Sequence, residues 1–73
     1  MNWRERIASD PKTLRGKPCI AGTRIPVALI LGYLAAGRDA AAIVREFPDL
    51  KVADIAACLE YARELADFEA VPA

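Results

Sequence analysis

The side chains best suited to chemistry in this sequence are four cations of its first half and of the turn that follows it. They are Arg15, Lys17, Arg24 and Arg38. Guanidinium and ammonium groups bind phosphate and carboxylate oxygens, so these positions predict a patch that contacts a nucleic acid or an acidic protein. A solvated basic surface without a partner is the alternative. Arg24 is the strongest candidate by its motif, described below, although hydrogen bonds that tie a hairpin to a helix are its alternative role.

The supply of nucleophiles, bases and metal ligands argues against catalysis. The sequence has no His, and Gly16-Lys17 lacks the further glycines of a phosphate-binding loop. Cys19 and Cys58 are too few to hold a structural zinc ion. We therefore expect no enzyme activity, no cofactor and no metal. Two buried thiols are the expected state of the cysteines, although their spacing leaves a disulfide open.

The charges are divided unequally between the two halves of the chain. Residues 1–38 carry seven basic and two acidic side chains, a net charge of +5. Residues 39–73 carry three basic and eight acidic side chains, a net charge of −5. This division predicts two faces with different partners. The alternative is that the halves neutralise each other within a dimer.

The elements that must position the cations begin with an extended arm over residues 1–26, which is punctuated by proline and glycine. Cys19-Ile20 and Arg24-Ile25 favour β structure and flank Ala21-Gly22-Thr23, which predicts a tight hairpin. Gly22 would supply a positive φ. We expect Gly22 and Thr23 together to have a structural role in the turn. Ile7 can add another extended piece.

Helical periodicity begins after the arm and predicts three helices. The first spans about 26–36, and Gly37 suits the position just past its end. Asp39 is the expected N-cap of the second, which stops at Pro48. The third runs from about 52 to 68, and its apolar stripe consists of Ile55, Cys58, Leu59, Ala62, Leu65 and Ala66.

The predicted fold is therefore mainly α: a three-helix, helix-turn-helix-like domain with a short N-terminal β-hairpin. We expect a single domain over residues 1–73, made of an arm at 1–26, a helical core at 27–68 and a tail at 69–73. The charged start lacks the apolar run of a signal peptide, and the longest apolar run is too short to span a bilayer. A cytoplasmic protein without a membrane partner is expected. Trp3, Tyr61 and Phe68 are candidate interface residues, because aromatic side chains are enriched at interfaces.

Two sets of residues are similar to the signature of one bacterial and archaeal family. The first is Ser9-Asp10-Pro11, Gly16-Lys17-Pro18 and Gly22-Thr23-Arg24-Ile25-Pro26-Val27, and the second is Pro48-Asp49-Leu50, Asp54-Ile55, Leu59 and Tyr61-Ala62. The chain resembles the family called domain of unknown function 433, whose members look like VapB-type antitoxins. The resemblance implies a dimeric helix-turn-helix-like domain that holds a PIN-like ribonuclease toxin inactive and regulates the shared operon.

This sequence departs from the family pattern at the start of the third helix. Lys51 stands where Thr or Ser is usual, so the capping box with Asp54 is broken, and Asp49 is an alternative cap. We expect the loss to cost about 1 kcal/mol if nothing replaces it. The first two turns, residues 52–57, also lack the Arg, Lys, Asn or Gln that base readout requires.

These observations favour an antitoxin-like module that binds a PIN-like toxin protein. A stand-alone repressor that binds DNA is the first alternative. A dimerisation or interaction module with no nucleic-acid role is the second. In every case we expect a homodimer.

Overall fold

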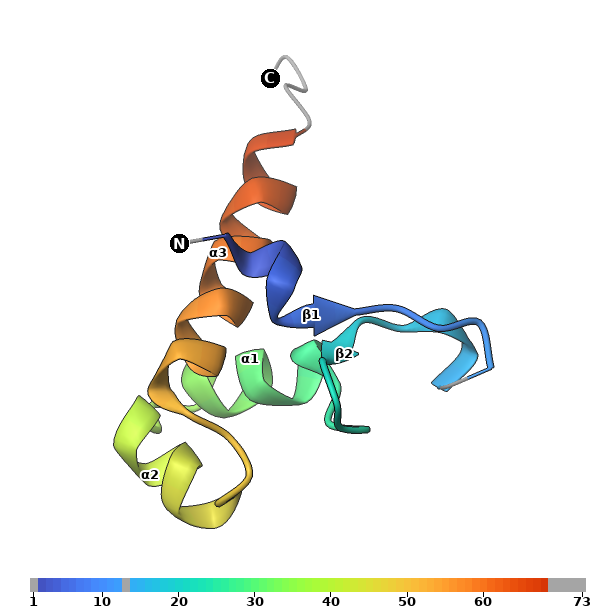
Figure 1. The fold of residues 1–73 in the computed structure, drawn as a ribbon. Coiled ribbons are helices and arrows are strands. Elements are labelled where there is room, and N and C mark those ends of the chain that lie inside the picture. Colours follow the sequence, from blue (N-terminus) through green and yellow to red (C-terminus); the bar gives the residue numbers. More distant parts are fainter. Residues whose placement is uncertain (1, 13, 69–73) are drawn as a thin grey trace.

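The computed structural model describes residues 2–12 and 14–68, so the tail predicted at 69–73 lies outside the described residues. Three helices follow an N-terminal region that contains two short strands, which confirms the predicted fold class (Figure 1). The helices are α1 (Val27–Ala35), α2 (Ala40–Glu46) and α3 (Val52–Phe68), and the strands are β1 (Ile7–Ala8) and β2 (Cys19–Ile20). Two 3-10 turns, η1 (Trp3–Glu5) and η2 (Leu14–Gly16), lie within the region predicted as an extended or β-hairpin arm.

Local sequence signals fix both ends of α1. Pro26 precedes the first helical residue and has an extended backbone. At the other end Gly37 has a φ of +94°, the left-handed conformation expected just past a helix. The backbone N–H of Gly37 donates to Leu34 and that of Arg38 to Tyr33, each at 3.0 Å. Both bonds of a Schellman motif are therefore made, and they satisfy carbonyls that the helix end leaves open.

The caps of α2 and α3 differ in completeness. Asp39 caps α2 as predicted, because its carboxylate accepts the backbone N–H of Ala42 at 2.8 Å. At α3 the Asp54 carboxylate accepts the backbone N–H of Lys51 at 2.8 Å. One half of the capping box is thus present although Lys51 cannot supply the other half.

The strand pairing differs from the predicted tight hairpin. β2 pairs antiparallel with β1, with Ile7 opposite Ile20 and Ala8 opposite Cys19. The turn between Ile20 and Ile25 does form, but only an isolated bridge joins Cys19 to Pro26. Proline has no backbone N–H, so the ladder cannot extend along Arg24–Pro26. β2 therefore takes its regular partner from the extended piece around Ile7.

The core lies where α1, α2 and the first half of α3 meet the two strands. Its buried members share an apolar side chain, and they are Ile7, Ile20, Val27, Ile30, Ile43, Leu50, Ile55, Ala57 and Cys58. Ile7 and Ile20 sit opposite each other in the sheet, so the strand pair anchors the N-terminal region to the helices. Within the described residues, no helix is long and apolar enough to cross a membrane.

The second half of α3 extends beyond this core (Figure 1). Leu59 and Leu65, both expected on the buried stripe, are 50% and 57% exposed. The stripe has the right period, but only its N-terminal part, with Ile55 and Cys58, is buried. η1 is the element that packs against the projecting part, through Trp3.

Candidate functional site

Four arginines of the chain are already engaged with carboxylates. The ion pairs are Arg4–Glu64 and Arg6–Asp54 at 3.1 Å, Arg38–Glu46 at 2.9 Å and Arg63–Glu60 at 3.5 Å. A paired guanidinium has already satisfied part of its charge and donor capacity. These four positions are therefore less available to a ligand than cations without a carboxylate partner.

Arg38 lies apart from the other three predicted binding residues. Its guanidinium contacts both carboxylate oxygens of Glu46, at 2.9 and 3.3 Å, and lies 4.7 Å from the ring centre of Tyr33. Glu46 raises the pKa of Arg38, and Arg38 lowers the pKa of Glu46. Arg38 follows the C-terminal end of α1, roughly 13 Å along the helix from the end that meets the arm. Its contacts are those of a clamp between α1 and α2.

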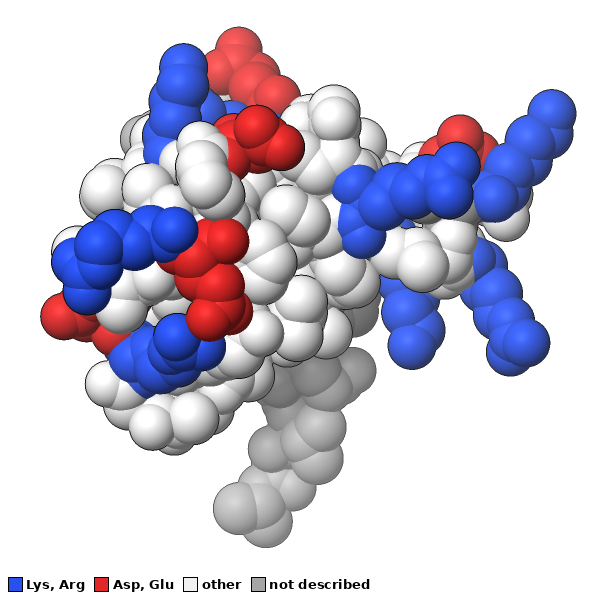
Figure 2. Space-filling model, turned by 90° about the horizontal axis from the view of Figure 1, so that it is seen from below, with Lys and Arg blue, Asp and Glu red and all other residues white. Residues whose placement is uncertain are grey.

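The remaining predicted cations lie in residues 9–25, which we call the basic arm. This segment contains the protruding loop between β1 and β2, the buried strand β2 and the exposed turn after it (Figure 1). Its one acidic residue is Asp10. Its four basic side chains are Lys12, Arg15, Lys17 and Arg24. All four are exposed. Within the part of the chain that the structure describes, none of them forms an ion pair. Viewed from below, the arm presents its basic side chains at one end of the molecule (Figure 2).

The backbone of the arm is held by a few specific bonds. Leu14 and Arg15 have positive φ angles of 50° and 58°, and Gly16 follows at 79°. The Ser9 hydroxyl donates to the carbonyl of Gly16, and the backbone N–H of Lys17 donates to Leu14 at 3.1 Å. Left-handed backbone is unfavourable for Leu and Arg, so these contacts hold a conformation that presents Arg15 to solvent.

Gly22 and Thr23 lie in the turn that follows β2. Gly22 has a φ of 79°, as the turn requires. The Thr23 hydroxyl donates to the carbonyl of Ile20 at 2.7 Å and accepts the backbone N–H of Ile25 at 3.0 Å. These bonds give Thr23 the role of a turn residue.

Arg24 does not tie this turn to α1. Its side chain makes no hydrogen bond within residues 2–12 and 14–68. The connection is made by backbone instead: Ile20 donates to the carbonyl of Ile25, and Val27 donates to the carbonyl of Pro18, each at 3.0 Å. The guanidinium of Arg24 is therefore left to solvent.

An apolar groove runs beside the arm. It consists of two adjoining hollows that share Lys17, Pro26 and Ala28, with volumes of about 430 and 310 Å³. Its walls come from the arm, α1 and α3, and they include the half-exposed leucines Leu14, Leu29 and Leu65 and the partly buried Tyr61. Lys17 lines both hollows, and Arg15 lines the larger of the two. The surface combines an apolar floor with a cationic edge, and sequence reasoning missed it because it depends on three separate elements.

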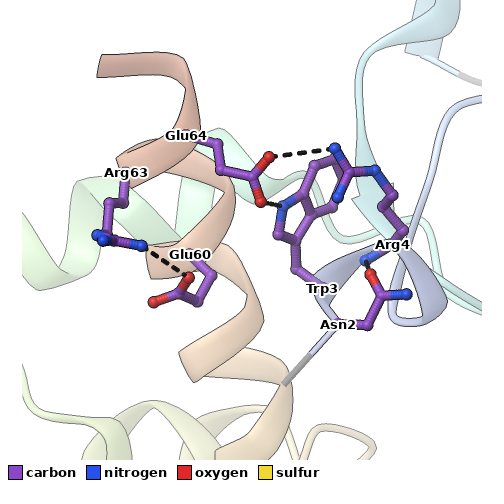
Figure 3. A network of polar contacts seen from close by, with 6 residues as sticks. All are labelled: Asn2, Trp3, Arg4, Glu60, Arg63 and Glu64. Carbon is purple, nitrogen blue, oxygen red and sulfur yellow. Dashed lines mark hydrogen bonds and ion pairs between the residues drawn. The ribbon is translucent and has the colours of Figure 1, made fainter. Parts of the chain in front are cut away.

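The aromatic residues predicted at an interface make contacts inside the chain. The Trp3 ring meets Tyr61 edge-on at 5.1 Å, and its indole N–H donates to the Glu64 carboxylate. Arg4 binds the other oxygen of that carboxylate and stacks over Trp3 at 4.5 Å, as Figure 3 shows. Trp3 is thus docked on α3 and is not loose. Phe68 closes α3, but its side chain lies outside what the structure describes.

The first turns of α3 do not present a base-reading face. Asp54, Ile55 and Ala57 are buried, and Val52 is exposed. Asp54 also pairs with Arg6, a role that sequence reasoning missed. Both cysteines are buried and free, and among the described residues no cluster of three or more His, Cys, Asp or Glu side chains could hold a metal ion.

Comparison with known proteins gives a family match and little else. No curated protein and no solved structure matches the chain. The model of one family, described as Protein of unknown function (DUF433), matches residues 7–62. That segment includes the basic arm, the groove-lining part of α1, the α2–α3 pair and Asp54. Because the match covers most of the sequence, the chain belongs to the DUF433 family.

Proposed function

We propose that this protein is an antitoxin-like binding module that neutralises a PIN-like ribonuclease toxin in the cytoplasm, and that it acts by binding and not by catalysis. The observation that carries the proposal is the apolar groove with its cationic edge. Protein interfaces combine an apolar centre with a polar rim, and large exposed apolar patches mark interaction sites. Leu29 and Leu14 supply the centre, and Arg15 and Lys17 supply the rim.

The charge of the surface indicates the chemistry of the partner. Nucleases of the PIN type hold catalytic metal ions with clustered carboxylates, so the mouth of such a site is acidic. An edge that carries Arg15 and Lys17 is complementary to that mouth. Two copies of this groove placed face to face would bring like charges together. The same complementarity therefore favours an acidic partner over a second copy at this surface.

Dimer formation and control of the operon complete the proposal. A homodimer would use a face of the molecule other than the groove. The unpaired cations of the arm favour a role on DNA as well, which leaves a stand-alone repressor as the second candidate function.

Co-expression with the product of the neighbouring gene tests the proposal. The wild-type protein should co-purify with that product and relieve its inhibition of growth. Leu29→Asp should lower the affinity at least roughly tenfold, because it places a charge on the apolar floor beside an acidic partner. Leu59→Asp is the matched control, since Leu59 is a half-exposed helical leucine that does not line the groove.

Three results would contradict the proposal. The first is that the neighbouring gene encodes no PIN-like protein, and the second is that the two products do not associate. Equal losses in Leu29→Asp and Leu59→Asp would show that the groove is not the contact surface. In the last case the complex forms through a surface other than the groove. Circular dichroism of both variants shows whether the loss of affinity comes from unfolding instead.

A further inference from the structure

We propose that the basic arm binds the phosphate backbone of duplex DNA without sequence preference, while α3 stays out of the grooves. This inference rests on the DNA-binding role within the proposed function and names the surface and the mode of contact. Contact of this kind supplies affinity for DNA and does not by itself select the operon. In a helix-turn-helix protein the second helix of the motif would be the expected reader. Here the charges on the surface indicate that the basic arm, and not α3, contacts the DNA.

The first argument is the division of the cations between paired and unpaired. Arg4, Arg6, Arg38 and Arg63 are each paired with a carboxylate. Outside the arm, Arg45 and Lys51 are the two cations without such a partner among the described residues. The four cations of the arm have no carboxylate partner within the described residues, and Asp10 is the single acidic residue among them. Unpaired cations can exchange their counterions for DNA phosphates without first breaking an ion pair.

The second argument is the position of the arm. The part of the arm between β1 and β2 projects away from the helices, and Arg24 is exposed on the turn that follows β2 (Figure 1). The cations of the arm gather at one end of the molecule, where they can approach a duplex (Figure 2). Residues outside the arm carry six basic and nine acidic side chains. That remainder is net negative and is repelled by phosphate. The field of the molecule therefore orients the arm toward DNA.

The third argument excludes base readout by α3. Readout in the major groove needs side chains such as Arg, Lys, Asn or Gln at the start of the recognition helix. The first two turns of α3 offer Val, Ala, Asp and Ile, and Asp54 and Ile55 are buried. The start of α3 therefore offers no cationic or amide side chain for base readout, and phosphate contact by the arm is the mode that the exposed chemistry supports.

The fourth argument separates duplex from single-stranded nucleic acid. Proteins that bind single strands stack the bases on aromatic side chains. The arm has no aromatic residue. Trp3, Tyr33, Phe47 and Tyr61 are partly buried against the core. Phosphate contact alone favours the duplex, which has the higher charge density.

Fluorescence anisotropy with a labelled 20-base-pair duplex of random sequence tests this inference. Four phosphate contacts predict that log K falls against log salt with a slope of about −3.6, so affinity should drop roughly 150-fold from 50 to 200 mM NaCl. The double variant Lys17→Gln, Arg24→Gln should halve the slope to about −1.8 and weaken binding at 50 mM NaCl at least roughly tenfold. Glutamine keeps much of each side-chain stem, and neither side chain makes a polar contact in the described residues.

The matched control is Arg45→Gln, Lys51→Gln. Both side chains are exposed and have no carboxylate partner in the described part of the chain, and the double variant removes the same two charges from outside the arm. Its affinity should stay within about twofold of wild type if local contact, and not net charge, governs binding. Circular dichroism checks that both double variants are folded.

Each contrary outcome overturns a stated part of the inference. Absence of wild-type binding at 25 mM NaCl overturns it entirely, and so does equal weakening by the control variant. Tighter binding to a single strand of the same length contradicts the duplex assignment. A preference of more than tenfold for the DNA upstream of its own gene would show base readout. Co-purification with the toxin is measured separately, so failure of DNA binding with an intact protein complex leaves the antitoxin proposal standing.

Discussion

Asp54 binds Arg6 across 48 residues of sequence, with 3.1 Å between the guanidinium nitrogen and the carboxylate oxygen. The other carboxylate oxygen accepts the backbone N–H of Lys51. One side chain therefore both caps α3 and fastens the N-terminal region to it. The side chain of Asp54 is only 11% exposed, so both contacts are partly shielded from water.

Replacing Asp54 should destabilise the protein through both contacts. We expect Asp54→Ala to lower the free energy of unfolding by about 2 kcal/mol, from a lost cap bond and a half-buried ion pair. Urea denaturation followed by circular dichroism measures it. Asp67→Ala, an exposed acidic position on the same helix, should change stability by less than about 0.5 kcal/mol. An Asp54→Ala variant as stable as Asp67→Ala would show that these contacts contribute nothing.

Trp3 should stabilise the N-terminal region and report on it, because it is the single tryptophan. Trp3→Phe keeps a ring against Tyr61 but loses the N–H donated to Glu64, at a cost of about 1 kcal/mol. Trp3→Ala should cost about 2 kcal/mol. Urea denaturation of both variants checks the order. In the wild type, acrylamide should quench Trp3 less than free tryptophan, and full quenching would contradict its docking on α3.

Stability should fall between about pH 9 and pH 11 because of Cys58. Burial, with a smaller effect of the nearby Asp54 charge, raises the pKa of the Cys58 thiol from 9.0 to about 11. In that window the unfolded chain loses the Cys58 proton while the folded protein keeps it, so ionisation favours unfolding. The wild type should lose stability more steeply than Cys58→Ala as pH rises from 9 to 11. Parallel curves in urea denaturation would contradict the shift.

The Arg38–Glu46 pair should be visible in the titration of Glu46. The Arg38 guanidinium lowers the pKa of Glu46 from its ordinary 4.5, so the pair contributes stability above that pH and loses it as pH falls through the lowered pKa. Arg38→Gln should move the Glu46 pKa back toward 4.5 in an NMR carboxyl titration. It should also leave DNA affinity close to wild type, since Arg38 lies outside the basic arm. A tenfold loss of DNA affinity would place Arg38 in the binding surface instead.

Sequence predicted the features that depend on near neighbours. Asp39 and Gly37 lie within three residues of the groups that they satisfy, so their types alone identify the ends of α1 and α2. The start of α3 at Val52 also follows from local pattern. These contacts need no knowledge of the rest of the fold, and for that reason the helix positions agree closely with expectation.

Sequence could not predict the features that depend on distant partners. The pairing of β2 with Ile7–Ala8 competes with the nearer Arg24–Ile25, and proline at position 26 decides against the latter. Arg38 and Arg24 are the same residue type, so the sequence does not distinguish them. In the structure Arg38 forms an ion pair with Glu46, and Arg24 has no carboxylate partner in the described residues. The apolar groove draws residues from positions 14 to 65, and no sequence window contains it.

The attachment of Trp3, Arg4 and Arg6 to α3 has a consequence for how the chain folds. Trp3, Arg4 and Arg6 find their partners 61, 60 and 48 residues later. These are the contacts of highest sequence separation, and closing long loops before the helices exist is entropically unfavourable. During synthesis this segment therefore leaves the ribosome before α3 but docks only after α3 is complete. Until then it is not anchored to the helices, and it is where proteases would act first on a nascent or partly opened chain.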